Sequence, residues 1–162
     1  MLNVCHWLEG TATGTLVRES LYGFPILVAI HLMGLMLSVG TIVWFDLRLI
    51  GLALQRVPVS VVYRRVIPWA TTGFLVMFST GALLFTGYAS AAVGNTFFRV
   101  KVAALMLAGT NALVYHAFTE RRVAEWDRSD RVPGAVRAAG FVSIAAWATV
   151  VLCGRLMAYT MY

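Results

Sequence analysis

Apolar residues gather in four long and almost uninterrupted stretches of the chain. The stretches cover roughly residues 22–50, 66–92, 97–118 and 135–159. At about 1.5 Å per residue, a helix of any of these lengths crosses the ~30 Å hydrocarbon core of a bilayer. Apolar and polar residues do not alternate as they would in the strands of a membrane barrel. The pattern therefore predicts an all-α fold, an integral membrane four-helix bundle that forms one domain over residues 1–162.

The segments outside these stretches fit this prediction. Pro25 and Pro68 fall in the first turns of the first two helices, where a missing N–H is harmless. Residues 1–20 mix apolar with polar side chains, and we expect them to form an interfacial segment on the outer face of the membrane. Residues 119–133 mix acidic residues with arginines. They are predicted to be either a solvated cytoplasmic loop or a docking surface for a partner.

The composition excludes a soluble globular protein. Hydrophobic residues make up 60% of the chain and charged residues 12%, whereas soluble domains carry about 45–50% and about 25%. The two cysteines, Cys5 and Cys153, form no C-x-x-C pair. This excludes a disulfide framework, a zinc ribbon and a covalently attached c-type haem. The motifs of zinc proteases, serine hydrolases and phosphate-binding loops are also missing, which argues against a hydrolase or a kinase.

The basic residues predict the orientation in the membrane. The net charge is +6. The basic residues lie mostly at the ends of the predicted helices, which is typical of the segments that flank membrane spans. They therefore do not indicate a nucleic-acid partner. With four spans, both termini and the second loop share one side. That side carries Arg18, Arg99, Lys101 and Arg155, and the other side carries nine of the thirteen basic residues. Because basic residues accumulate in cytoplasmic loops, both termini are predicted to lie outside.

Few ionisable residues lie within the predicted spans, and such residues are candidates for function because they are costly in lipid. They are His31 and Asp46 in the first span, Lys101 and His116 in the third, and Arg155 in the fourth. The second span adds two neighbouring faces that could contribute to a polar interior, Thr72–Ser79–Thr86 and Gly73–Thr80–Gly87.

Both histidines lie on helix faces that carry small or polar residues. On a helical wheel the face of His31 continues to Ser38, and the face of His116 includes Gly109 and Ala112. Such faces pack against other helices and not against lipid. One histidine on each of two helices is the minimum for a b-type haem, whose iron takes imidazole nitrogens as axial ligands. A packed histidine bonded to a carbonyl or a hydroxyl is the structural alternative at both positions.

The two histidines are predicted to lie at different depths. His31 is nine residues past Tyr22, and His116 is 19 residues past Phe97. These separations correspond to about 13 Å and about 28 Å, on helices that run in the same direction. The offset of about 15 Å makes one shared iron difficult. The helices could be shifted along their axes, each histidine could serve a separate haem with a partner from another residue or another chain, or no haem is bound.

Other residues could complete these sites. Met106 lies at the predicted depth of His31 and is an acceptable sixth haem ligand. Arg155 could reach toward the same level and pair with a haem propionate. On the opposite side, His116 and Asp46 are predicted at similar depth. This pair could orient a ligand or carry a proton, but an interfacial salt bridge explains the same facts.

Several short motifs resemble a family of small bacterial inner-membrane proteins of unknown function, and the resemblance covers nearly all of the chain. It implies a multi-pass protein of the bacterial inner (plasma) membrane. More distantly, the chain is similar to four-helix b-type cytochromes, which hold each haem between paired histidines, and to the membrane part of copper resistance protein D. The residues that carry the family resemblance are Arg18 to Pro25, His31 to Gly34, Asp46 to Arg48, Pro68 with Trp69, Phe98 to Lys101, Asn111 to His116, and Gly154 with Arg155.

The leading hypothesis is therefore a membrane protein that binds haem b and carries electrons between membrane or periplasmic partners. Its ligand candidates are His31 and His116, and a second copy of the chain could contribute to the site. The alternative hypothesis is a non-catalytic membrane subunit or scaffold without a cofactor. A third hypothesis is a protein that handles copper or a small solute, since Cys5 with His6 and seven methionines offer ligands that suit Cu(I).

Overall fold

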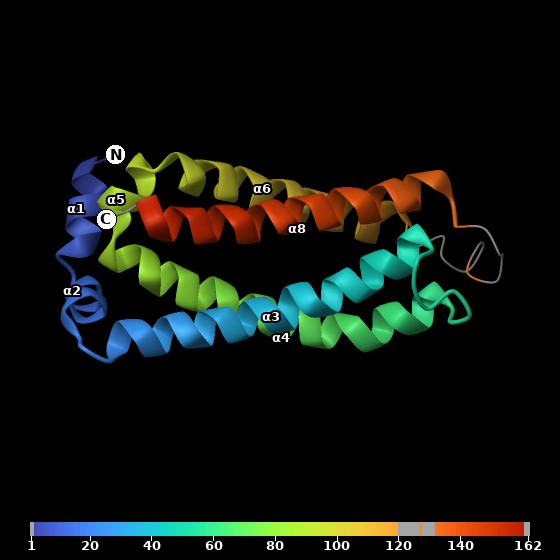
Figure 1. Cartoon of the computed structure of the whole chain (residues 1–162), viewed down its shortest axis with the longest axis horizontal. Coiled ribbons are helices and arrows are strands. Elements are labelled where there is room, and N and C mark those ends of the chain that lie inside the picture. The colour runs from blue at the N-terminus through green and yellow to red at the C-terminus, as the bar shows by residue number, and fades with distance from the viewer. Residues whose placement is uncertain (1, 120–126, 128–131, 161–162) are drawn as a thin grey trace.

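The computed structural model describes residues 2–119, 127 and 132–160, and the chain forms a bundle of four long helices (Figure 1). No strand occurs among the described residues. Each long helix is long and apolar enough to cross a membrane, so the predicted all-α multi-pass architecture is confirmed. The long helices are α3 (Gly23–Ile50), α4 (Val59–Gly87), α6 (Thr96–Val114), which continues into the π-helix η1 (Tyr115–Thr119), and α8 (Gly134–Thr160). The short helices are α1 (Leu2–Glu9), α2 (Ala12–Glu19) and α5 (Ala89–Gly94).

The second long helix differs from its predicted extent of 66–92. It begins seven residues earlier, at Val59, because Arg64 and Arg65 interrupt the apolar pattern but do not end the helix. Pro68 therefore lies in the interior of α4 and not in its first turn, as the sequence had indicated. The helix ends at Gly87, and a separate short helix, α5, covers most of the remaining stretch. The apolar pattern thus located the span but not the ends of the helix.

A loop residue caps the beginning of α4. The backbone N–H of Ser60 donates to Oδ1 of Asp127 at 3.2 Å, and the hydroxyl of Ser60 donates to the same carboxylate. A carboxylate at a helix N-terminus satisfies an unpaired N–H and interacts favourably with the helix dipole. Asp127 therefore links the third loop to the N-terminus of α4 through hydrogen bonds. Most of the loop predicted at 119–133, namely residues 120–126 and 128–131, lies outside the described residues.

Helices α3 and α4 cross where their backbones almost touch. A Cβ atom on Gly73 would lie 2.5 Å from the backbone nitrogen of Ser38, and one on Gly34 would lie 2.8 Å from that of Met77. Ser38 itself is completely buried at this crossing. Membrane helices commonly associate through small residues that let their backbones approach. The crossing therefore needs glycine at both positions.

Helices α6 and α8 form the other side of the bundle. The small residues Ala104 and Ala108 line the inner face of α6, and Trp147 of α8 packs into the same apolar cluster. Gly109, Ala112 and His116 are exposed. The prediction that this face packs against other helices was therefore wrong for Gly109 and Ala112, because the inner face of α6 is rotated toward its alanines. His116 nevertheless contacts Tyr63 of α4. Further members of this cluster are Met77, Ala146 and Val150.

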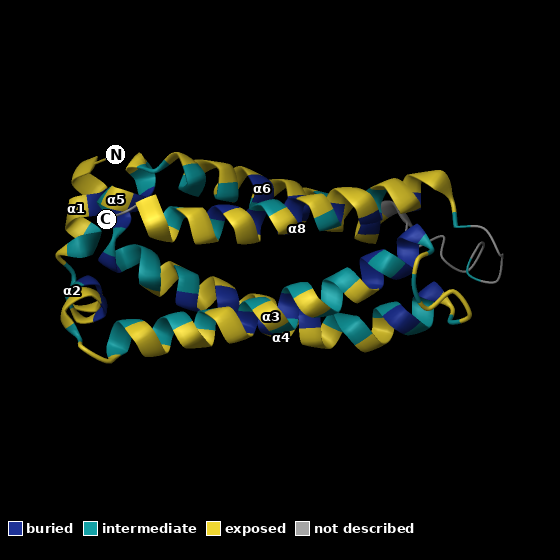
Figure 2. Cartoon of the chain, viewed as in Figure 1, coloured by how far each residue is buried: buried dark blue, intermediate teal, exposed yellow. Residues whose placement is uncertain are grey.

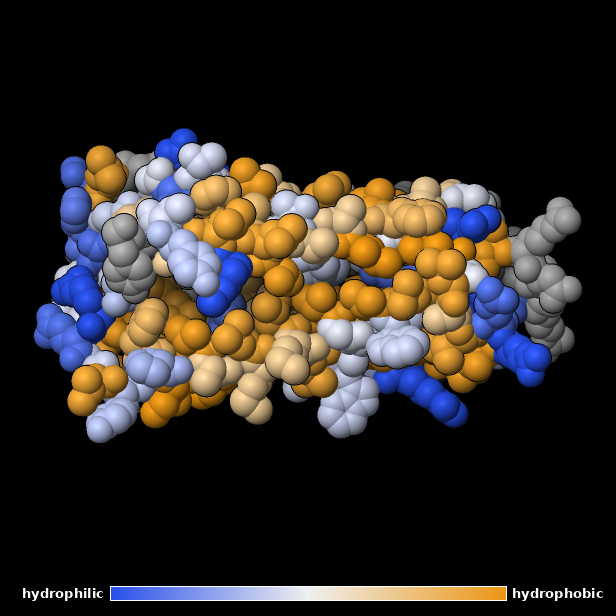
Figure 3. All heavy atoms as spheres, in the orientation of Figure 1, coloured by the Kyte–Doolittle hydropathy of each residue, from blue (hydrophilic) through white to orange (hydrophobic). Residues whose placement is uncertain are grey.

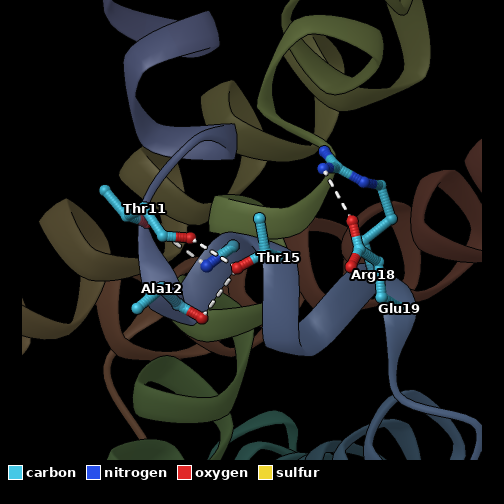
Figure 4. Close-up of polar contacts among 6 residues, drawn as sticks. Thr11, Ala12, Thr15, Arg18 and Glu19 are labelled. Atoms are coloured by element: carbon cyan, nitrogen blue, oxygen red, sulfur yellow. Dashed lines mark hydrogen bonds and ion pairs between the residues drawn. The ribbon is translucent and has the colours of Figure 1, made fainter.

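The short helices cover one end of the bundle, which also holds both described ends of the chain (Figure 1). We call this the terminal end, and we call the opposite end, which carries residues 51–58, the loop end. Thr11 begins α2 by accepting a hydrogen bond from the backbone N–H of Gly14 at 3.2 Å, and Arg18 forms an ion pair with Glu19 at 3.6 Å (Figure 4). Apolar side chains such as Trp7 remain exposed on this layer.

The outer surface of the four long helices is largely apolar. Between 11% and 39% of the most apolar window of each helix is buried within the bundle. Exposed residues run along all four helices (Figure 2), and apolar side chains form a broad band between polar ends (Figure 3). Phe78 is 64% exposed and Leu75 is 59% exposed. Because such a surface is unfavourable in water, the band indicates the part of the protein that lies in lipid.

Candidate functional site

His31 is held by a threonine of the neighbouring helix. Its Nδ1 lies 3.1 Å from Oγ1 of Thr80 on α4. The single hydroxyl proton of Thr80 is directed to the carbonyl oxygen of Val76, 2.6 Å away. In the Nδ1–H tautomer, His31 donates to this hydroxyl, and His31 is also hydrogen-bonded to the backbone of Met77. In the neutral imidazole this tautomer leaves the lone pair on Nε2, which is the nitrogen arrangement of a histidine that binds a metal.

Lys101 lies near His31 and Cys153 lies near Lys101, so each of the four long helices contributes to the group. Lys101 of α6 interacts electrostatically with His31 and with Cys153 of α8. Two glycines provide the space for the longer side chains. A Cβ on Gly81 would lie 3.1 Å from the His31 ring, and one on Gly154 would lie 3.7 Å from Nζ of Lys101. The terminal-side cluster is defined here as His31, Thr80, Gly81, Lys101, Cys153 and Gly154.

The terminal-side cluster contains a cation but no carboxylate. Among the described residues, ion pairs join His6 to Glu9 and Arg18 to Glu19, and none involves Lys101. An ammonium group within a membrane span is costly without a counter-charge. The cluster can therefore attract an anionic or electron-rich group of a ligand.

Two residues that the sequence assigned to this level point elsewhere. Met106 is 68% exposed on α6, so its thioether lies on the lipid-facing side of the bundle. Arg155 donates from Nη2 to the hydroxyl of Tyr159 at 2.9 Å, and its guanidinium lies 4.9 Å from the centre of that ring. The structure therefore brings neither Met106 nor Arg155 together with His31.

His116 lies in the other half of the bundle, toward the loop end. Its Nδ1 is 3.1 Å from the hydroxyl of Tyr63. Tyr63 is 17 residues before Thr80 on α4, which corresponds to about 25 Å along the helix. His31 and His116 are thus at clearly different levels, as the sequence predicted, although the separation along α4 exceeds the predicted offset.

Asp46 lies at the same end as His116 but has a different partner. Its side chain is hydrogen-bonded to Ser143 of α8. The rings of Phe45 and Tyr115, the residues beside Asp46 and His116, are 5.5 Å apart, so the predicted similarity in depth holds. No ion pair joins Asp46 to His116, both of which are among the described residues. The predicted salt bridge was therefore wrong.

The predicted copper ligands at the terminal end belong to a structural contact. His6 lies 3.6 Å from the carboxylate of Glu9 and 3.4 Å from the hydroxyl of Ser90, while Cys5 is buried. Within the described part of the chain, no group of three or more His, Cys, Asp or Glu residues could hold a metal ion.

The comparisons with known proteins identify a family but no relative of known activity. Residues 7–160 match a family of unknown function, DUF6644. No curated protein and no solved structure was found to match, so the distant similarity to b-type cytochromes and to copper resistance protein D stays a prediction. The match extends over almost the whole chain, which includes the terminal-side cluster. The chain therefore belongs to the family of unknown function DUF6644.

Proposed function

We propose that the protein binds one b-type haem through His31 and carries electrons between partners in or beside the membrane. The observation that carries this proposal is the hydrogen bond between Nδ1 of His31 and Thr80, which in the Nδ1–H tautomer leaves the lone pair on Nε2. A bound haem would supply a one-electron redox centre. His31 would hold the haem iron, and Thr80 would fix the tautomer and orientation of the imidazole ring.

In this proposal Lys101 pairs with a haem propionate, the role predicted for Arg155 from the sequence. The ammonium of Lys101 acts on His31 and lacks a carboxylate partner among the described residues, so it can pair with a haem propionate. The donor set fits one imidazole ligand per chain and not two, because the other histidines are His6 in α1 and His116 toward the loop end. We therefore propose His31 without His116 as the haem ligand within one chain. Any second axial ligand would come from another residue or a second copy.

The proposal also covers location and partners. If the termini lie outside, as the basic residues predict, the terminal-side cluster lies in the periplasmic half of a bacterial inner membrane. A haem at this level would exchange electrons with a partner in the membrane or in the periplasm. Fusion of topology reporters, described below, tests this orientation independently of haem.

Absorption spectra of the purified protein test the proposal directly. We expect a Soret band in the oxidised protein and an α-band after reduction with dithionite, when the protein is produced with ample haem. His31→Ala should abolish both bands, whereas His116→Ala and His6→Ala should retain them. If His31→Ala and His116→Ala each abolish the bands at unchanged protein abundance, one iron is shared and the proposed ligation is wrong.

A threonine pair distinguishes a positioning role from general packing. Thr80→Val removes the acceptor of Nδ1 and should weaken haem binding about 10- to 100-fold, the usual cost of losing such a partner. Thr72→Val is the matched control, because the hydroxyl of Thr72 also bonds to a carbonyl four residues back, at 2.8 Å, but lies on the exposed face. Equal haem titrations for the two variants would contradict the role of Thr80.

The alternative function is a membrane subunit or scaffold without a cofactor. It is favoured by the packing of His31 against Gly81 and of Lys101 against Gly154, since these side chains already occupy the space beside the glycines. An absent Soret band in the unmodified protein, despite ample haem, would exclude the haem proposal and favour this alternative. Retention of copper after dialysis, lost in a Cys5→Ser variant, would instead favour copper handling.

A further inference from the structure

Asp46 is the one acidic residue in the four long helices that the structure describes, and it is buried. The residue is 4% exposed, and its Oδ2 atom has no hydrogen-bond partner among the described residues. The other interaction of the carboxyl group is the hydrogen bond with Ser143. A carboxylate oxygen that accepts no hydrogen bond in an apolar region is costly, and an ionised group more so. Among the described residues, no hydrogen-bond donor contacts Oδ2 to offset the charge of an ionised carboxylate.

No cation on the neighbouring elements compensates Asp46. On α8, the packed groups are Ser143 and the backbone at Gly140, where a Cβ would lie 3.1 Å from the carbonyl oxygen of Asp46. On α3, Arg48 is buried but its Nε donates to the carbonyl oxygen of Val57 at 2.7 Å. Within the described residues, neither Arg48 nor any other cation forms an ion pair with Asp46.

Titratable groups of α4 and η1 lie close to Phe45, the residue before Asp46 in the chain. The neighbouring residue Phe45 has its ring 5.5 Å from that of Tyr63 and 5.5 Å from that of Tyr115. Tyr63 is in turn hydrogen-bonded to His116, which is exposed. These hydroxyl and imidazole groups lie at the same end of the bundle as Asp46, and they are of the kind that pass protons along hydrogen bonds.

We propose that Asp46 is a proton-binding site within the membrane, which exchanges its proton with water at the loop end past Tyr63 and His116. A proton bound to the carboxyl group removes a charge that no cation among the described residues neutralises in an ion pair. The proton enters from water and returns to it, so no other reactant is needed. Ser143 orients the carboxyl group by its hydrogen bond. This site is separate from the terminal-side cluster, and it does not depend on haem.

Infrared spectroscopy of the protein in a detergent without carbonyl groups, such as dodecyl maltoside, tests the proposal. A protonated carboxyl group buried in the bundle should give a C=O stretching band well separated from ionised carboxylates, and the band should shift in D2O. We expect the band to disappear in Asp46→Asn and to persist in the matched control Asp127→Asn, which changes a loop carboxylate. Absence of the band from the unmodified protein across a pH titration, or its persistence in Asp46→Asn, would overturn the proposal.

Two further variants keep the test decisive if Asp46→Asn does not fold. Ser143→Ala retains the carboxyl group but removes its hydrogen-bond partner, so the band should shift in frequency without disappearing. Tyr63→Phe should leave the band in place and slow its exchange with D2O at least severalfold. An unshifted band in Ser143→Ala would show that the absorbing group is not Asp46, and unchanged exchange in Tyr63→Phe would exclude the proposed route.

Discussion

At the scale of single residues, Glu9 joins two short helices at the terminal end. Its carboxylate accepts a hydrogen bond from the backbone N–H of Ser90 in α5 at 2.7 Å. This hydrogen bond is the main cause that lowers the pKa of Glu9 below its ordinary value, and the nearby His6 adds to the effect. Because the ionised form is the one that is bound, the contact between α1 and α5 depends on pH.

The sign of this dependence follows from the lowered pKa. The stabilisation is complete above the ordinary pKa of about 4.5 and is lost as the pH falls through the lowered value of the folded protein. Glu9→Gln should lower the free energy of unfolding at neutral pH by less than about 1 kcal/mol, since the site is near water. The stabilities of the two proteins, measured in detergent against pH, should converge as the pH falls through the lowered pKa of Glu9. A constant difference at all pH values would contradict this role of Glu9.

At the scale of helices, the crossing of α3 and α4 is the most demanding contact in the bundle. Gly73→Ala places a methyl group 2.5 Å from a backbone nitrogen, so the helices must separate. We expect a loss of about 1–3 kcal/mol, typical of overpacking, which thermal unfolding in detergent would detect. Gly40→Ala is the matched control, because nothing lies within 4 Å of its added Cβ. Equal stability of the two variants would contradict the close approach.

The depth of a residue in the bundle could be predicted from the sequence, but the rotation of its helix could not. Counting residues correctly separated His31 from His116, because depth depends on a fixed rise per residue. Met106 lies on the exposed face of α6 and not on the predicted inner face, since the alanines of α6 and the bulk of Trp147 determine which side of the helix turns inward. Rotation thus depends on packing between helices, which the apolar pattern of a single helix does not contain.

The same limit applies to the terminal-side cluster. Thr80 belonged to one of two neighbouring faces that looked equally suited to a polar interior, and the structure buries Thr80 while it leaves Thr72 and Ser79 exposed. Cys153 gave no signal, because a lone cysteine in an apolar helix resembles its neighbours. Its proximity to Lys101 arises from the pairing of α6 with α8.

At the scale of the whole molecule, the even number of spans fixes both ends of the chain on one side. The described ends lie together at the terminal end, as expected for four spans (Figure 1). The excess of arginine at the opposite end predicts that the loop end is cytoplasmic. The orientation of the protein in the membrane is therefore predicted from the distribution of basic residues, because the fold is the same in either orientation.

Reporter fusions test the orientation. A reporter after residue 162 should give a periplasmic signal, and one inserted between residues 120 and 131 should give a cytoplasmic signal. Both fusions contain the full chain, so opposite signals from the two reporters would show that the protein has inserted into the membrane in each case. The reverse pair of signals would invert the orientation and place the terminal-side cluster in the cytoplasmic half, while the fold would be unaffected.

The contact between His31 and Gly81 also has a consequence for the evolution of the family. An added Cβ at position 81 would lie 3.1 Å from the imidazole ring, closer than side chains normally approach. A side chain at position 81 therefore requires the imidazole ring of His31 to shift, which couples substitutions at the two positions. Lineages that replace Gly81 by a larger residue should have replaced His31 as well, whereas Gly40 should vary without regard to position 31. Paired substitutions of this kind would record which lineages have abandoned the chemistry of this histidine.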